Sequence, residues 1–192
     1  MMLILIRHGQ TDWNATGRWQ GQADPPLNAA GRAQAHQTAL ELQAQRLDVL
    51  VSSDLRRARE TAEIIAAAIN RDVILEPRLR EVNLGEWQGL YSDDIRARWP
   101  GEMQLWLDMP LAARPPNGES IQELAARVLA AVDELAARYP DRRVGLVAHE
   151  LPIAVIVTHA AGVPLARLRQ HIPANAAWQL VEWSRAASTP TT

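Results

Sequence analysis

The feature that most constrains this chain is the segment Leu3–Ile6, which runs directly into Arg7, His8 and Gly9. An uninterrupted apolar run bounded by glycine predicts a short strand in the core of an α/β sheet. Ligands of such sheets bind just beyond the carboxyl ends of the strands. Guanidinium offers phosphate a rigid fork of donors, and imidazole can attack phosphorus. We therefore expect Arg7 and His8 to line a crevice that suits a tetrahedral anion.

Further along the chain, apolar runs alternate with segments of helical periodicity. Side chains that cap helix N-termini precede three of the helical segments: Asn28, Ser53 or Asp54, and Ser120 with Glu123. The patterns predict strands at 48–52, 73–75, 143–148 and 178–183, and helices at 29–45, 55–69, from 120 to near 140, and after 149.

This alternation predicts an α/β fold, a three-layer α/β/α sandwich with a mainly parallel central sheet. His8, Ser53 and His149 each follow one of the predicted strands. Because the carboxyl ends of parallel strands meet at one edge of a sheet, these three residues are expected to converge there.

Composition narrows the classes of function. The chain has 192 residues, a formal net charge of −2 and no cysteine. The near-neutral balance gives no basic face, so neither a nucleic-acid nor a membrane partner is expected. The lack of cysteine excludes disulfides, thiolate metal sites and a cysteine nucleophile. The apolar start is too short to span a bilayer and is interpreted as a strand, with the cytoplasm as the expected location.

Four separated motifs stand at strand ends and helix starts: Arg7-His8-Gly9-x-Thr11-x-x-Asn14, Ser53-x-Leu55-x-Arg57-Ala58-x-x-Thr61-Ala62, Leu79-x-Glu81 and Val147-Ala148-His149. In sequence and order they resemble the motifs of the histidine phosphatase superfamily, also called phosphoglycerate mutase-like. The resemblance implies a single domain of this type over residues 1–184, and the polar segment 185–192 is expected to be a flexible tail.

The resemblance assigns catalytic roles to five residues. It implies that His8 is the nucleophile that accepts the phosphoryl group and that Glu81 is the proton donor. Arg7, Arg57 and His149 would supply positive charge to the phosphate oxygens. These roles agree with what phosphoryl transfer needs, and they require neither a metal nor a cofactor. Although Arg56 is an alternative by sequence, the Leu-x-Arg-Ala register favours its neighbour.

The expected substrate-binding residues come from the first loop and from the helix after His149. Asn14 would be a neutral donor to phosphate, and Gln20 and Gly21 belong to a second stretch that flanks the pocket. Trp13, Trp19 and Trp87 would either form an aromatic wall for the leaving group or simply be buried. His36, His159 and His171 lie outside any motif and are expected at helix surfaces or in the core.

One departure from the family pattern follows the second histidine. The family commonly has Gly-Gly there, whereas this chain has Glu150 and Leu151, which also complete the expected substrate-binding set. If Glu150 pointed inward, it would repel phosphate and raise the pKa of His149; pointed outward, it would be harmless at a helix N-terminus. The outward orientation is the prediction.

The predicted function is a phosphomonoester hydrolase, most similar to the short bacterial phosphatases that include α-ribazole phosphatase. Mutases of the superfamily carry a long insertion before Gly118-Glu119-Ser120 that helps to exclude water, and this chain has only a short segment there. The substrate would be α-ribazole phosphate or another small phosphorylated metabolite. The alternatives are a cofactor-dependent phosphoglycerate mutase and a non-catalytic module that binds a phosphorylated ligand. The oligomeric state stays open, a homodimer included.

Overall fold

The computed structural model describes residues 1–184, within which five strands form one sheet in the order β3-β2-β4-β1-β5. The strands are β1 (Met2–Arg7), β2 (Val49–Ser52), β3 (Val73–Leu75), β4 (Arg143–Ala148) and β5 (Trp178–Glu182). Only β5 runs antiparallel to its neighbour, β1, among these strands. The predicted α/β class and the mainly parallel sheet are confirmed. The predicted tail, 185–192, lies outside the described residues.

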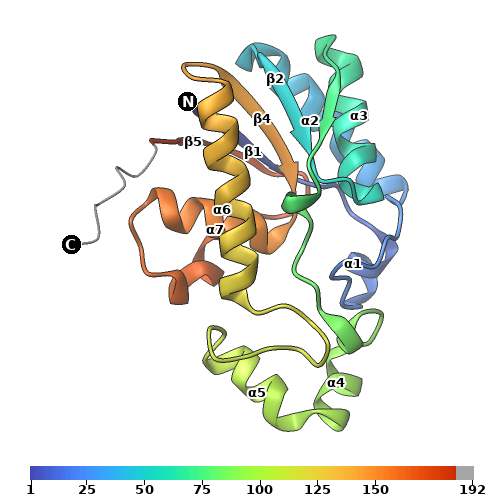
Figure 1. Ribbon diagram of the computed structural model, residues 1–192. Coiled ribbons are helices and arrows are strands. Elements are labelled where there is room, and N and C mark those ends of the chain that lie inside the picture. The colour runs from blue at the N-terminus through green and yellow to red at the C-terminus, as the bar shows by residue number, and fades with distance from the viewer. Residues whose placement is uncertain (185–192) are drawn as a thin grey trace, which may run out of the picture.

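Helices cover both faces of the sheet, with α2 and α3 on one side and α6 and α7 on the other (Figure 1). The helices are α1 (Asp12–Thr16), α2 (Ala29–Leu42), α3 (Arg56–Ile69), α4 (Ser92–Arg98), α5 (Pro100–Asp108), α6 (Ile121–Arg138) and α7 (Glu150–Ala160). Short 3₁₀ segments add η1 (Gln43–Gln45), η2 (Pro77–Leu79), η3 (Gly85–Trp87) and η4 (Leu165–His171). The predicted three-layer arrangement is therefore confirmed.

The alternation of side chains along β1 divides the core into two parts. Leu3 and Leu5 pack in the cluster that contains α6 and α7, whereas Ile4 and Ile6 pack in the cluster that contains α2 and α3. All four are at most 1% exposed. A strand buried on both faces needs an unbroken apolar run, which explains why this segment carries no polar residue. Truncating any of the four to Ala would cost about 2–5 kcal/mol.

One predicted cap is wrong. The first residue of α3, Arg56, donates its backbone N–H to Asp24 Oδ1 at 2.6 Å, and Leu55 occupies the N-cap position. Ser53 Oγ instead accepts from the Leu55 N–H at 3.3 Å. The cap comes from a loop 32 residues upstream, which local spacing does not reveal. The predicted caps at Asn28 and Ser120 are confirmed, and Glu123 completes the capping box.

The segment between β3 and α6 forms a lobe below the sheet, on the side toward which the arrow of β4 points (Figure 1). It contains α4 and α5, and Trp106 of α5 packs against Trp19 and Trp87 with ring centroids 6.2 and 5.8 Å away. This packing brings the lobe over the carboxyl ends of the strands, where the sequence places its motifs.

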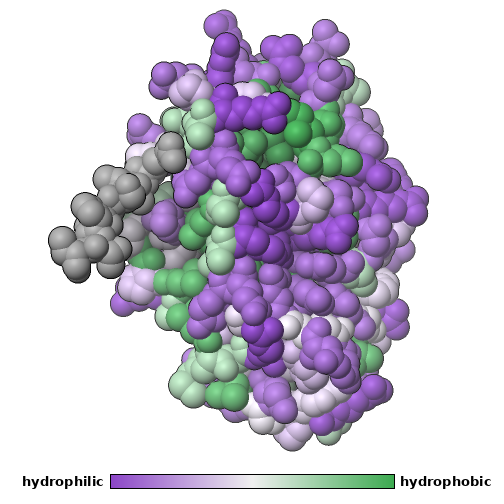
Figure 2. All heavy atoms as spheres, in the orientation of Figure 1, coloured by the Kyte–Doolittle hydropathy of each residue, from purple (hydrophilic) through white to green (hydrophobic). Residues whose placement is uncertain are grey.

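The face shown in Figure 2 is mostly hydrophilic, with an apolar patch over the edge strand β3. Ile74 and Leu75 are 37% and 46% exposed there. The edge that they occupy is only three residues long, which limits its ability to pair with another strand. In residues 1–184 no single helix is long and apolar enough to cross a membrane; the bent pair of α7 and η4 passes that test only when counted together.

Candidate active site

The three strand ends converge as expected. The ring centroids of His8 and His149 lie 5.1 Å apart, and His149 Nε2 lies 2.8 Å from Ser53 Oγ. A cavity of about 360 Å³ opens beside them. Nine of the ten predicted site residues line it: Arg7, His8, Asn14, Gln20, Gly21, Arg57, Glu81, Glu150 and Leu151. The tenth, His149, is fully buried next to His8.

The backbone fixes the tautomer of His8. Its Nδ1 lies 2.7 Å from the carbonyl oxygen of Gly9, and because a carbonyl only accepts, Nδ1 carries the proton. The lone pair is then on Nε2, which accepts a hydrogen bond from Arg57 Nε at 3.2 Å. Burial, followed by the charges of Arg57 and Arg7, holds the pKa of His8 well below its ordinary value. At neutral pH the imidazole is therefore neutral, with a free-base nitrogen at Nε2.

Arg57 is the most confined cation of the site, at 1% exposure. It donates to His8 and, from its two terminal nitrogens, to the carbonyls of Ala23 and Gly21, each at 2.8 Å. Burial lowers its pKa to about 10, an effect that Glu81 opposes, so it stays charged at neutral pH. Arg56 is exposed and pairs with Glu60, whereas Arg57, which the register favoured, lines the cavity.

Glu150 points into the cavity, so the predicted outward orientation is wrong. Its Oε2 pairs with Arg7 Nη2 at 2.7 Å, while Arg7 Nη1 donates to the carbonyl of Pro173 at 2.5 Å. The guanidinium draws the carboxylate inward because it offers an opposite charge at the start of α7. The pKa of His149 is lowered by burial and by Arg57 rather than raised, and so that expected consequence of an inward Glu150 is also wrong.

Glu81 lies in the cavity wall with its carboxyl group buried. Its Oε1 accepts from the Val82 N–H at 2.9 Å, and its Oε2 accepts a longer hydrogen bond from the Leu151 N–H at 3.4 Å. Burial, with a smaller contribution from Glu150, raises the pKa of Glu81 to about 7. A carboxyl group with this pKa exchanges protons near neutral pH, as a general acid and base must.

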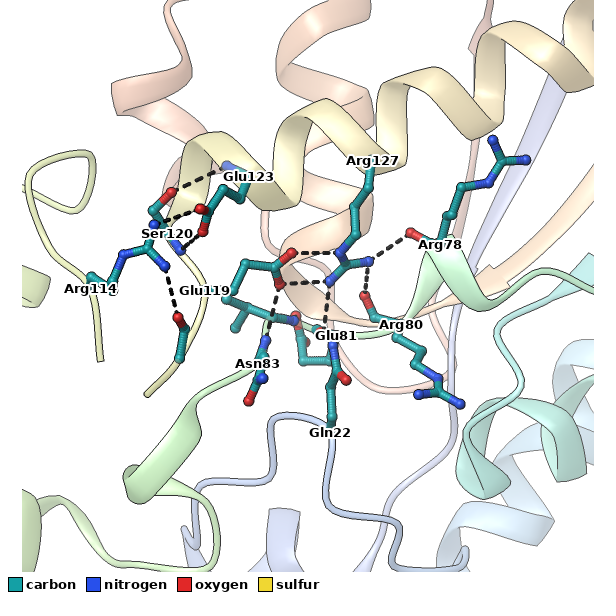
Figure 3. A network of polar contacts seen from close by, with 12 residues as sticks. Gln22, Arg78, Arg80, Glu81, Asn83, Arg114, Glu119, Ser120, Glu123 and Arg127 are labelled. Carbon is teal, nitrogen blue, oxygen red and sulfur yellow. Dashed lines mark hydrogen bonds and ion pairs between the residues drawn. The ribbon is translucent and has the colours of Figure 1, made fainter. Parts of the chain in front are cut away.

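A network around Arg127 of α6 holds the backbone of Glu81 in place (Figure 3). Arg127 Nη2 donates to the Glu81 carbonyl at 3.0 Å, and Nη1 donates to the carbonyls of Arg78 and Arg80. The same guanidinium makes a two-pronged ion pair with Glu119, at 2.6 and 2.8 Å. The turn before α6 and the loop after η2 are thereby tied together.

The first loop is shaped by side-chain hydrogen bonds. Thr11 caps α1, and its N–H donates to Asn14 Oδ1 at 3.1 Å. The oxygen end of the Asn14 amide is thus occupied, which leaves its donor end, Nδ2, for the cavity that the residue lines. The Thr11 hydroxyl has one proton and lies 3.1 Å from Asn14 Oδ1 and 2.9 Å from Gln20 Oε1, so it donates to one of the two oxygens at a time. Thr11 itself is fully buried and orients the loop.

The outer part of the cavity, which we call the rim, consists of Trp13, Arg18, Trp19, Trp106 and Arg169. The Arg18 guanidinium lies 5.2 Å from the ring centroids of both Trp13 and Tyr91, and Arg169 lies 5.8 Å from that of Trp106. The two tryptophans predicted as an aromatic wall, Trp13 and Trp19, line the cavity. The third, Trp87, is completely buried and belongs to the core.

Sequence reasoning missed four residues at the site: Arg18, Trp106, Arg169 and Asn175. Asn175 Nδ2 donates to the carbonyl of His8 at 3.1 Å, across 167 positions of sequence. Only Arg18 carried a local signal, since it lies in the first loop between Gly17 and Trp19. The three histidines outside the motifs are placed away from the cavity, with His36 exposed on α2 and His159 stacked on Trp183.

Comparison with known sequences supports the motifs. The profile of the histidine phosphatase superfamily (branch 1) matches residues 3–191. Phosphoserine phosphatase 1 of Hydrogenobacter thermophilus is 34% identical over 179 residues, which are 93% of this chain and 85% of that protein. The probable phosphoglycerate mutase GpmB of Escherichia coli is 38% identical over 85% of this chain and 76% of its own length.

Solved structures agree with the fold. A mycobacterial glucosyl-3-phosphoglycerate phosphatase in complex with VO3 is 39% identical, with a TM-score of 0.86, over 93% of this chain and 90% of its own. The α-ribazole phosphatase of Shigella flexneri is 26% identical, with a TM-score of 0.89, over 96% and 92% of the two chains. The strand-end motifs, their convergence and these matches together identify the chain as a member of the histidine phosphatase superfamily.

Proposed function

We propose that this protein is a phosphomonoester hydrolase that acts through a phosphohistidine on His8, with Glu81 as the proton donor. The observation that carries the proposal is the state of His8, whose Nδ1 proton is held by a backbone carbonyl and whose neutral Nε2 lies at the cavity. A neutral imidazole beside a cationic pocket suits in-line attack on phosphorus, for which Nε2 must give up the hydrogen bond that it accepts from Arg57 Nε.

In the first step, His8 Nε2 forms a bond to phosphorus while the ester P–O bond breaks. The departing oxygen takes the proton of Glu81, whose pKa of about 7 allows the carboxyl group to hold that proton at neutral pH. Arg7 and Arg57 lie at the cavity with fixed charges and would stabilise the equatorial phosphate oxygens. Arg7 is already paired with Glu150, so phosphate must share this guanidinium with a carboxylate.

We assign His149 the role of a hydrogen-bond donor to the phosphate group. Ser53 Oγ accepts from the Leu55 N–H, so its own hydroxyl proton is available to His149 Nε2. His149 then carries its proton on Nδ1, which is buried and has no hydrogen-bond partner among residues 1–184. A buried donor of this kind is costly unless a ligand satisfies it, and a phosphate oxygen would do so.

In the second step, Glu81 acts as a base. It takes a proton from water, the water oxygen bonds to phosphorus, and the N–P bond breaks to release inorganic phosphate and free His8. Positive charge for both steps comes from the arginines, and His149, whose pKa is lowered, contributes a neutral N–H donor in place of the charge expected from sequence, so we propose that no metal or cofactor takes part. The substrate is a small phosphorylated metabolite, because the cavity of about 360 Å³ is at the small end for ligand sites.

The test is phosphate release in EDTA from a panel that contains α-ribazole phosphate, phosphoserine and glucosyl-3-phosphoglycerate. His8→Ala should abolish release and the acid-labile phosphoenzyme, whereas His36→Ala, which removes an exposed histidine, should match the wild type. Release that survives His8→Ala would contradict the proposal, as would an absolute need for added metal.

A mutase is the second candidate because one relative is named a probable phosphoglycerate mutase. It predicts that 2- and 3-phosphoglycerate interconvert faster than either is hydrolysed when bisphosphoglycerate is present. The segment between Glu81 and Gly118 contains only α4 and α5 beyond its 3₁₀ turn, which favours water entry and hydrolysis. Saturable phosphate binding without turnover would instead indicate a non-catalytic binding module.

A further inference from the structure

The rim of the cavity carries two cations that the proposed reaction at His8 does not use. Arg18 and Arg169 both line the cavity, and among residues 1–184 no carboxylate lies within ion-pairing distance of either guanidinium. The Nε of Arg18 is buried and has no hydrogen-bond partner in the same part of the chain. Arginines elsewhere on the surface, such as Arg80 with Asp54 and Arg114 with Glu123, form ion pairs.

Both guanidinium groups are held in place without being neutralised. Arg18 lies between the rings of Trp13 and Tyr91, each 5.2 Å from the guanidinium carbon. Arg169 lies over Trp106 and donates to the carbonyl of that same residue. Aromatic faces and a carbonyl orient a guanidinium but leave its full positive charge available to a ligand.

The net charge of the side chains that line the cavity also exceeds what a single phosphate group balances. Four arginines and two glutamates line it, and Glu81 is uncharged when it holds the proton for the leaving group. Three positive charges then remain in excess, and the phosphate group of a monoester at neutral pH carries about two negative charges. One positive charge stays unbalanced, and the unpaired cations that would account for it are at the rim.

We propose that the rim is an anion subsite for the leaving group, so that the preferred substrates are phosphomonoesters whose alcohol carries a second negative group. Carboxylate and phosphate share the relevant chemistry, since both accept paired hydrogen bonds from guanidinium. The flanking tryptophans provide apolar contact for the carbon skeleton between the two charged ends. This inference rests on the proposed function, because it concerns the other end of the same substrate.

The test uses three esters on one two-carbon skeleton: 2-hydroxyethyl phosphate, 2-phosphoglycolate and ethane-1,2-diol bisphosphate. We expect kcat/KM for the two anionic esters to exceed that for the neutral ester about tenfold or more, as for a charged hydrogen bond. The bisphosphate is corrected for its two equivalent groups. A preference for phosphoglycolate would indicate a carboxylate substrate, and a preference for the bisphosphate would indicate a second phosphate.

Arg18→Gln and Arg169→Gln should each lower the ratio of kcat/KM between anionic and neutral esters about tenfold. Arg96→Gln, which removes an exposed charge on α4, is the matched control and should leave that ratio unchanged. Arg18→Lys and Arg169→Lys should restore the ratio in part because they keep the charge. Melting temperatures of all variants would confirm that they fold.

A wild-type ratio near one, or a ratio that neither glutamine variant lowers, would overturn the inference while leaving the phosphatase intact. If the wild type released no phosphate from any ester, the proposed function would fail instead, and binding would decide the subsite. Calorimetric titration should then show tighter binding of phosphoglycolate than of 2-hydroxyethyl phosphate to the wild type only. Equal affinities would overturn it.

Discussion

In the inner part of the cavity Arg57 is held by three hydrogen bonds at 1% exposure, whereas at the rim Arg18 lies between two aromatic rings in a half-buried position. The inner groups come from strand ends and from the helix starts that follow them. The rim comes from the first loop, the lobe and η4. The comparison separates an inner part held by hydrogen bonds, where we propose that the reaction occurs, from a rim held mainly by aromatic faces, which we propose selects the substrate.

The strongest test of this comparison is to remove the proposed proton donor. Glu81→Gln keeps the shape of the side chain but removes the acidic proton, so kcat should fall about 10²- to 10⁴-fold for every substrate. Steady-state phosphate release from neutral and anionic esters measures it. The loss should be smaller for an ester whose leaving group is a good one, such as 4-nitrophenol. An equal, small loss for all esters would place the proton donor elsewhere.

The next effect concerns the network that holds Glu81. Arg127→Gln leaves Glu119 and several carbonyls without their partner, and should lower the free energy of unfolding by about 2–4 kcal/mol. It should also lower kcat, because the Glu81 backbone loses a donor. Chemical denaturation measures the stability. Arg96→Gln, which breaks an exposed pair with Asp93, should change it by less than about 0.5 kcal/mol.

A smaller effect is expected from a substitution of Glu150, at the boundary between the inner part of the cavity and the rim. The pKa of Glu81 is raised to about 7, by burial first and Glu150 second, so activity should fall as pH rises through 7 and the donor loses its proton. Glu150→Gln removes one of the causes that raise the pKa of Glu81, so the fall of kcat at alkaline pH should begin at a lower pH. The pH profile of kcat measures it.

The fall of kcat at acidic pH gives an internal reference in the same pH profile. In the proposed mechanism His8 must be neutral to attack, and its pKa lies well below the ordinary value of 6.5, so activity should persist well below that pH. Glu102→Gln, an exposed carboxylate on α5, should shift neither limb. An alkaline limb that stays in place in Glu150→Gln would mean that Glu150 does not act on Glu81.

The smallest expected effect sharpens the description of the rim. Tyr91→Leu removes one of the two rings that hold Arg18 while leaving the guanidinium in the chain. The preference for anionic over neutral esters should fall only about two- to fivefold, the size of a cation–π contact at an exposed site. The measurement is the ratio of kcat/KM for 2-phosphoglycolate and 2-hydroxyethyl phosphate. A tenfold fall would show that Tyr91 does more than orient Arg18.

Most of the inner part of the site was accessible from sequence because Arg7, His8 and His149 each stand next to a local pattern. The run before Arg7 and His8 predicts β1, and the segment before His149 matches β4 from Arg143 to Ala148. Strand ends in a parallel sheet meet without any knowledge of loops, so convergence followed from topology alone. Glu81 has no such pattern around it and was found only through the resemblance to the family.

The rim and the orientation of Glu150 were not accessible in this way. Arg169 reaches Trp106 across 63 positions, and no periodicity records such a contact. Glu150 was expected to point outward because a helix N-terminus tolerates an exposed carboxylate, but the nearby Arg7 supplies a stronger partner. The cap of α3 failed for the same reason, since Asp24 comes from a distant loop. Local sequence patterns fail to predict the orientation of a charged side chain where a residue from a distant part of the chain offers it a stronger partner.

The hydrogen bond between His8 Nδ1 and the Gly9 carbonyl has a consequence for the durability of this site. In many enzymes a carboxylate orients the histidine, and one point mutation removes it. Here the orienting oxygen belongs to the main chain, which every amino acid possesses. The position is also closed to larger residues, because a Cβ at Gly9 would lie 2.3 Å from the carbonyl oxygen of Gly31. No change of a side chain can delete the oxygen that orients His8, whereas a substitution at Gly9 itself would displace the backbone that carries it.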